Sequence, residues 1–89
     1  MKVFLHQKAA RFLEKLDNQI KDRIKEKIKQ LEKNPKKGKL LRYSNFRSLR
    51  IGNYRVIYEI SENRVIVLFI GHRKNVYDDF SRLFLFSIL

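Results

Sequence analysis

The stretch RSLRIGNYRVIYEI, residues 47–60, decides the fold class. Apolar and polar residues alternate on both sides of Gly52-Asn53, a dipeptide that favours a two-residue hairpin turn. We therefore predict two antiparallel strands, 47–51 and 54–60. Strand alternation places Arg55 on one face of this sheet, with Ile57 and Glu59, and Val56, Tyr58 and Ile60 on the other.

A third strand follows from the residues just beyond the hairpin. Ser61-Glu62-Asn63 forms a second turn signal, and residues 64–70 are apolar on both faces. A strand with two apolar faces is typical of the interior of a sheet, so we predict that this strand has another strand on each side.

The residues before the hairpin have helical periodicity. Apolar side chains recur at steps of three and four, and Asp17-Asn18 interrupts them with two good N-cap residues. The pattern ends at Asn34-Pro35, because the residue before proline avoids helical dihedrals. Two antiparallel helices, roughly 6–15 and 18–33, fit this pattern; one continuous helix is the alternative.

The remaining segments complete a single domain, residues 1–89. Residues 2–5 form an edge strand, 36–39 a basic loop, and Asp78 caps a last short helix. The apolar residues of 80–89 either pack on the domain or are covered by a partner. The fold class is α+β, with an N-terminal helical hairpin packed on one face of a small antiparallel sheet.

Composition excludes several classes of protein. With 89 residues and no cysteine, the chain is neither a disulfide scaffold nor a thiol enzyme. The longest apolar run, 65–70, is too short to cross a membrane, and a histidine follows the N-terminus too early for a signal peptide. The two histidines and few acids have no metal-ligand spacing. We expect a cytoplasmic protein with no metal, no cofactor and no membrane contact.

Charge is the most informative property. Lys and Arg number 21 against 9 acids, a formal charge of +12. Residues 33–58 hold eight of the basic residues and no acid. Such an excess in a small domain is typical of a protein that binds a polyanion.

Arginines at sheet positions sharpen this expectation. Arg47, Arg50, Arg55 and Arg73 occupy places where strands usually carry β-branched or aromatic residues. A solvated sheet face is one interpretation. A phosphate-binding face is the other, since guanidinium groups that repel one another are neutralised by phosphate, which they match in a bidentate manner.

The segment 48–60, together with 65–70 and GHRKNVY at 71–77, resembles the RelE/ParE toxin superfamily, and in particular its RelE branch of ribosome-dependent messenger-RNA endonucleases. The resemblance covers nearly the whole chain. It implies a RelE-like, microbial-ribonuclease-like fold.

The resemblance also implies roles for single residues. Arg55 and Arg73 correspond to phosphate and transition-state ligands, Tyr77 to a tyrosine that orients or stacks on a base, and Arg50 to a basic residue of the preceding strand. At Ser48 the family usually has Lys or Arg, a place that Arg47 or Lys39 would take over. Further contacts to RNA are expected from basic residues around these positions: Lys37, Lys39, Arg42, Arg47, His72 and Lys74.

The implied function is that of a type II toxin, a messenger-RNA interferase that cleaves by metal-free attack of the 2′-hydroxyl and so inhibits translation. Its implied partners are the ribosome, messenger RNA and an acidic RelB-like antitoxin, with which it forms a hetero-oligomer. The alternative is a basic binding protein without cleavage activity, such as a ParE-like DNA gyrase inhibitor or a nucleic-acid-binding module.

Overall fold

The computed structural model describes residues 1–42 and 44–81. Its elements follow the chain in this order: β1 (Lys2–Leu5), α1 (Gln7–Glu14), α2 (Asn18–Lys29), the 3₁₀ turn η1 (Gln30–Glu32), β2 (Lys39–Leu40), β3 (Phe46–Ile51), β4 (Tyr54–Ser61), β5 (Arg64–His72) and α3 (Val76–Phe80). The fold class is α+β, as predicted.

The strands form one five-stranded sheet in the order β1-β5-β4-β3-β2. The pairs β2–β3, β3–β4 and β4–β5 are antiparallel, whereas β1 lies parallel to β5. The predicted hairpin and the strand after it are confirmed, with β5 between β1 and β4. Strand β2 and the parallel pairing were not predicted, because a two-residue strand has no periodicity and Lys2 pairs with Arg64, far along the chain.

The first half of the chain is a helical hairpin, not one continuous helix. Asp17 is the N-cap of α2: its Oδ1 accepts hydrogen bonds from the backbone N–H groups of Gln19 and Ile20, at 3.0 and 3.2 Å. His6 caps α1 in the same way, since its Nδ1 accepts from the N–H of Lys8 at 3.1 Å. The predicted break in the helical pattern is therefore confirmed.

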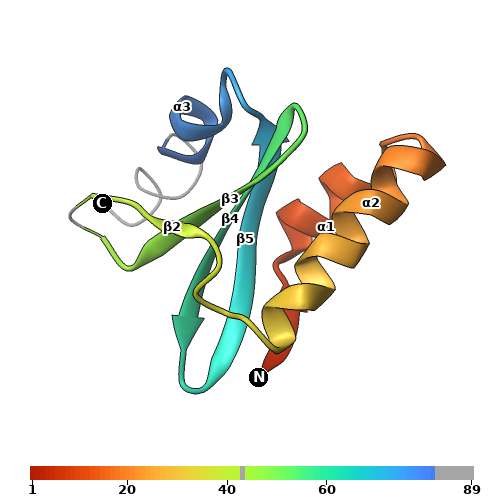
Figure 1. Cartoon of the computed structure of the whole chain (residues 1–89). Coiled ribbons are helices and arrows are strands. Elements are labelled where there is room, and N and C mark those ends of the chain that lie inside the picture. Colours follow the sequence, from red (N-terminus) through yellow and green to blue (C-terminus); the bar gives the residue numbers. More distant parts are fainter. Residues whose placement is uncertain (43, 82–89) are drawn as a thin grey trace.

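Each face of the sheet packs against helix (Figure 1). On one face, α1 and α2 cover a core that includes Val56 and Tyr58. On the other face, the short helix α3 covers a smaller cluster that includes Ile57. The predicted alternation along β4 is thus correct. Asp78, expected to cap the last helix, lies inside α3, and Asn75 holds the N-cap position.

A bulge in β5 sets the width of the second cluster. Ile57 pairs with Phe69 and Tyr58 with Val67, so Leu68 is an extra residue in β5. Leu68 and Phe69 both pack in the cluster under α3. The bulge therefore directs two successive apolar side chains to the face that α3 covers, and α3 packs against them.

The loop before β2 is held by a buried tyrosine. The Tyr58 hydroxyl donates to the carbonyl of Pro35 at 2.7 Å and accepts from the N–H of Gly38 at 2.8 Å. Burial raises the pKa of Tyr58, opposed by the Gly38 hydrogen bond and by the charge of Arg47. A Cβ on Gly38 would lie 2.6 Å from the Tyr58 oxygen, so only glycine allows this approach.

Candidate functional site

A serine, an arginine and a tyrosine meet on the sheet face that carries α3. Tyr77, on α3, donates its hydroxyl to Ser48 Oγ at 3.1 Å, and Arg55 Nη1 donates to the same oxygen at 3.4 Å. The Arg55 guanidinium carbon lies 5.8 Å from the centroid of the Tyr77 ring, within the range of a cation–π contact. Ser48 itself is buried. The three side chains form a preorganised polar cluster beside the apolar residues that pack under α3.

The register of the sheet adds two further cations to this face. Arg50 pairs with Arg55 across the β3–β4 hairpin, and Lys39 pairs with Ser48 across β2–β3. Residues directly opposite one another in an antiparallel pair project from the same face. Like charges in such a pair destabilise a sheet, so the Arg50–Arg55 pair favours an anion between or above the two groups.

Arg73 follows the end of β5, next to the hairpin turn. Its backbone N–H donates to the carbonyl of Asn53 at 2.8 Å, which extends the β4–β5 ladder by one bond. Gly71 pairs with Arg55, and strand alternation directs residue 73 to the same face as residue 71. The Arg73 side chain is exposed. Lys74, also exposed, is the next residue of the turn.

Three of the residues predicted to contact RNA lie elsewhere. Arg47 pairs with Tyr58 and so belongs to the opposite face, where its Nη1 donates to the Gly38 carbonyl at 2.9 Å. His72 packs edge-on against Tyr54, also on that face, with ring centroids 5.9 Å apart. Lys37 donates to Gln30, the first residue of η1.

Arg47 and Lys39 were the two residues expected to replace a basic residue at position 48, and the structure favours Lys39. Lys39 shares a face and a register position with Ser48, whereas Arg47 points to the other side. The Ser48 hydroxyl is itself part of the cluster, although the sequence analysis treated it only as a departure from a pattern. The hairpin turn at Gly52-Asn53 could have indicated the position of Ser48, since the turn fixes which residues of β3 and β4 lie opposite one another.

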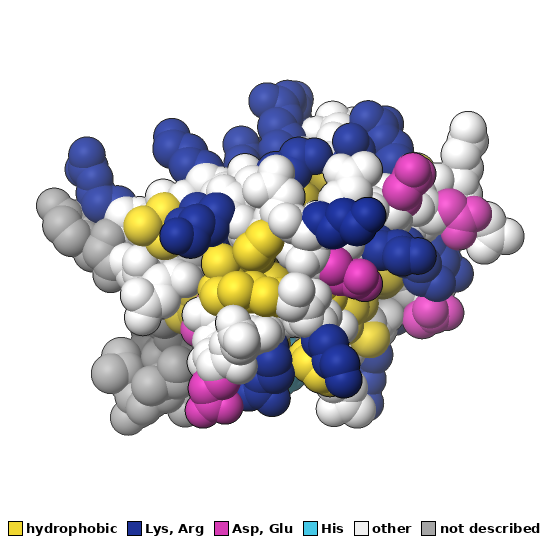
Figure 2. Space-filling model, turned by 60° about the horizontal axis from the view of Figure 1, so that its bottom comes forward, with side chains coloured by type: hydrophobic (Ala, Val, Ile, Leu, Met, Phe, Trp, Pro, Cys, Tyr) yellow, Lys and Arg dark blue, Asp and Glu magenta, His cyan; other side chains and the backbone are white. Residues whose placement is uncertain are grey.

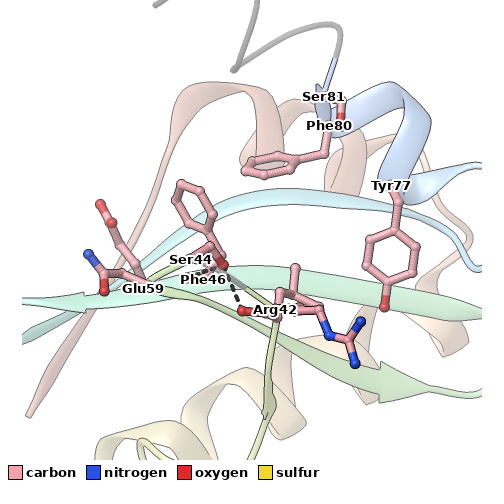
Figure 3. A pocket seen from close by; sticks show the side chains of 9 residues that line it. Arg42, Ser44, Phe46, Glu59, Tyr77, Phe80 and Ser81 are labelled. Carbon is pink, nitrogen blue, oxygen red and sulfur yellow. Dashed lines mark hydrogen bonds between the residues drawn. The ribbon is translucent and has the colours of Figure 1, made fainter.

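A cavity of about 470 Å³ adjoins the cluster. Tyr77 and Arg42 stand at one end and Glu59 at the other, with Phe46 and Phe80 between them (Figure 3). The Arg42 side chain extends toward the end at which Tyr77 stands. Phe46 and Glu59 were not predicted as site residues, because the cavity that they line with Phe80 depends on how α3 packs.

Basic side chains dominate the surface. Figure 2 shows Lys and Arg spread over much of one side of the molecule, around an apolar patch. Within the described residues, no three His, Asp or Glu side chains come together as metal ligands would. None of the helices in residues 1–42 and 44–81 is long and apolar enough to span a membrane.

Comparisons with known proteins agree with this fold. Residues 3–77 match the family model described as the ParE toxin of the type II toxin–antitoxin system parDE. The toxin–antitoxin complex RelBE2 of Mycobacterium tuberculosis contains a chain that is 32% identical, with a TM-score of 0.73 over 81% of this chain and 96% of that one. A comparison with curated protein sequences finds no match.

Two further solved structures share the fold. A chain of the RelB–RelE antitoxin–toxin complex from Methanococcus jannaschii is 26% identical, with a TM-score of 0.66 over 86% of this chain and 98% of that one. The isolated E. coli RelE toxin, 20% identical, has a TM-score of 0.70 over 99% and 98%. Fold and family together define a toxin of a type II toxin–antitoxin system. The chain belongs to the RelE/ParE superfamily.

Proposed function

We propose that this toxin is a ribosome-dependent endoribonuclease that acts on messenger RNA in the cytoplasm, without a metal or cofactor. The observation that carries the proposal is the contact of Tyr77 and Arg55 through Ser48, beside the paired Arg50. An aromatic ring next to a group of guanidiniums is suited to RNA, which offers a base to stack and a phosphate to bind.

In the proposed reaction the ribose 2′-oxygen attacks the adjacent phosphorus and the bond from phosphorus to the 5′-oxygen breaks. The 2′-hydroxyl loses its proton and the leaving 5′-oxygen gains one, so the products are a 2′,3′-cyclic phosphate and a 5′-hydroxyl. Negative charge gathers on the non-bridging oxygens in the transition state. Arg55, Arg73 and Arg50 are assigned to stabilise that charge, because donors held in place act without reorganisation.

The need for a ribosome is proposed from the makeup of the cluster. Among the described residues, no histidine or carboxylate forms a hydrogen bond or ion pair with the side chain of Arg55 or Tyr77. The cluster therefore offers charge stabilisation but no evident acid–base pair. Positioning of the RNA by the ribosome, which aligns the 2′-oxygen with the phosphate, supplies the missing part of the rate enhancement.

Partners follow from the same proposal. The similar chains from Mycobacterium tuberculosis and Methanococcus jannaschii were solved as complexes with antitoxins. We propose an acidic, RelB-like antitoxin for this chain too, since a charge of +12 with a basic sheet face attracts a polyanionic protein.

A second candidate function has its own observation. The family model that matches is the ParE one, and this favours a toxin that inhibits DNA gyrase without cutting RNA. On this hypothesis the basic face binds a protein or DNA, and the Ser48–Tyr77 contact is structural.

The two functions separate in one experiment. The purified toxin is incubated with message-programmed ribosomes and with naked RNA, the RNA ends are mapped, and gyrase supercoiling is assayed in parallel. We expect cuts only on ribosomes, and cutting that survives a chelator under conditions that keep ribosomes intact. Equal cutting of naked RNA contradicts ribosome dependence, and gyrase inhibition without RNA cleavage favours the second function.

A further inference from the structure

The cavity beside Tyr77 is a polar-ended slot with an aromatic wall. The rings of Phe46 and Phe80 are 5.1 Å apart between centroids and nearly perpendicular, at 81°. Both line the cavity, between Tyr77 at one end and Glu59 at the other (Figure 3). Its volume, about 470 Å³, is within the range of small-ligand sites. A flat ring suits such a wall better than a bulky aliphatic group does.

Glu59 gives this slot its chemical selectivity. Among the described residues, no donor forms a hydrogen bond or ion pair with its carboxylate. Glu59 is only half-exposed and is the register partner of Phe46, so it is held at the slot. A carboxylate repels phosphate, so this end of the slot favours a ligand that brings hydrogen-bond donors.

Among the four RNA bases, guanine matches a carboxylate best. Its Watson–Crick edge has two adjacent donors, N1–H and the N2 amino group, which a carboxylate accepts in a bidentate manner. Adenine and cytosine place an acceptor beside their amino donor. Uracil flanks its N3–H with two carbonyl oxygens, which a carboxylate repels.

The spacing connects the slot to the proposed phosphate site. Ser48 and Phe46 project from the same face two residues apart on β3, a separation of about 7 Å along the strand. Tyr77 contacts Ser48 and also lines the slot. A phosphate held at the Ser48 end therefore leaves the base of a flanking nucleotide within reach of Phe46 and Glu59.

We propose that this slot binds a guanine base next to the phosphate bound by Arg55, with Glu59 accepting hydrogen bonds from N1–H and N2–H. This inference rests on the proposed function for the phosphate site. It goes beyond that function by giving the toxin a base preference of its own, set by Glu59, independent of any preference that the ribosome imposes.

The test is an NMR titration of the full chain with guanosine, adenosine, cytidine and uridine 3′-monophosphates. We expect the guanosine nucleotide to shift the amide signals of Phe46, Glu59 and Tyr77 at roughly tenfold lower concentration than the others, which is typical of one bidentate base contact. Glu59→Gln removes this difference and leaves the weak phosphate-driven binding. Glu62→Gln is the matched control, because Glu62 lies in the exposed β4–β5 turn.

Three results overturn the inference: equal binding of all four nucleotides, a guanine preference unchanged in Glu59→Gln, or no shift at the slot. The titration measures no cleavage, so its outcome is distinct from that of the nuclease proposal. Selective guanine binding by a toxin that cuts no RNA supports the slot and contradicts the nuclease. Cleavage on ribosomes without guanine selectivity does the reverse.

Discussion

At the scale of single residues, the proposed chemistry depends on Arg73. It is exposed, and its backbone bond to Asn53 does not require its side chain. We expect Arg73→Ala to lower the rate of messenger-RNA cleavage on ribosomes by about 10²–10³, or about 2.7–4 kcal/mol, which is typical for loss of one transition-state donor. The free energy of unfolding should change by less than about 1 kcal/mol. RNA end mapping and urea unfolding measure the two effects.

Arg73→Lys is the control for charge alone. A lysine keeps the cation but cannot contact phosphate in a bidentate manner, so its activity should remain low. If Arg73→Ala still cuts RNA and inhibits growth, the assignment is wrong and the gyrase or binding hypothesis moves ahead.

Tyr77→Phe separates stacking from hydroxyl chemistry. The variant keeps the ring beside Arg55 but loses the hydrogen bond to Ser48 Oγ. We expect a loss of activity much smaller than that of Arg73→Ala, with a stability cost of about 1 kcal/mol. A loss as large as that of Arg73→Ala assigns the Tyr77 hydroxyl to the chemistry. Single-turnover cleavage on programmed ribosomes distinguishes the two results.

Tyr58 links one residue to the pH dependence of stability. Burial raises its pKa above the ordinary 10.0, so the folded state holds this proton more tightly than the unfolded state does. The contribution of the protonated Tyr58 to the free energy of unfolding is complete below pH 10 and is lost as the pH rises through the higher folded-state pKa. We expect Tyr58→Phe to cost about 1–3 kcal/mol near neutral pH, because the Gly38 N–H loses its acceptor.

The difference between wild type and Tyr58→Phe should shrink above pH 10, as measured by urea unfolding at several pH values. Tyr54→Phe is the control: Tyr54 is only partly buried, and its described contacts are ring contacts with Phe12 and His72. A difference that stays constant up to pH 11 contradicts the proposed origin.

At the scale of the elements, two turns set the register that builds the site. Gly52 has a φ of +58°, while Asn53 has a negative φ, the sign pattern of a type II′ hairpin turn. Glu62 and Asn63 both have positive φ, 51° and 66°, as in a type I′ turn, where glutamate is strained. We expect Gly52→Ala to destabilise the protein by about 1 kcal/mol or more, and Glu62→Asn to stabilise it by up to about 1 kcal/mol.

Thermal unfolding of both variants tests this interpretation. Glu62→Asn also removes the exposed ion pair with Arg64, which contributes little. A Glu62→Asn variant that melts below wild type would show that the ion pair outweighs the backbone strain.

These elements also show how far the sequence could be interpreted. The β3–β4 hairpin and the strand after it followed from alternation and turn residues, and the hairpin brought Arg50 opposite Arg55. The same register pairs Arg47 with Tyr58 and Ser48 with Ile57. The sheet face of Arg47 and of Ser48 could therefore have been predicted from the sequence, by extending the alternation of β4 to its partner strand β3. The parallel β1–β5 pair, the bulge at Leu68 and the packing of α3 on Phe46 depend on contacts between distant segments, which local patterns do not encode.

At the scale of the whole molecule, the net charge of +12 governs association with partners. Opposite charges speed encounter and stabilise a complex at low salt, and both effects weaken as added ions screen them. The exposed apolar side chains of Phe4, Leu5 and Leu40 contribute an attraction that salt does not screen. The two contributions therefore separate by their salt dependence.

We expect the acidic antitoxin proposed above to bind this toxin with an affinity that falls steeply from about 50 mM to about 0.5 M NaCl and then levels off. The fall reflects screening of the charges, and the plateau reflects apolar burial. Calorimetry or surface plasmon resonance over a salt series measures the curve. The double variant Lys39→Gln and Arg42→Gln should flatten its slope but keep its plateau, because it removes two cations and no apolar contact. A complex whose affinity is the same from low to molar salt contradicts the electrostatic part, and one that dissociates completely contradicts the apolar part.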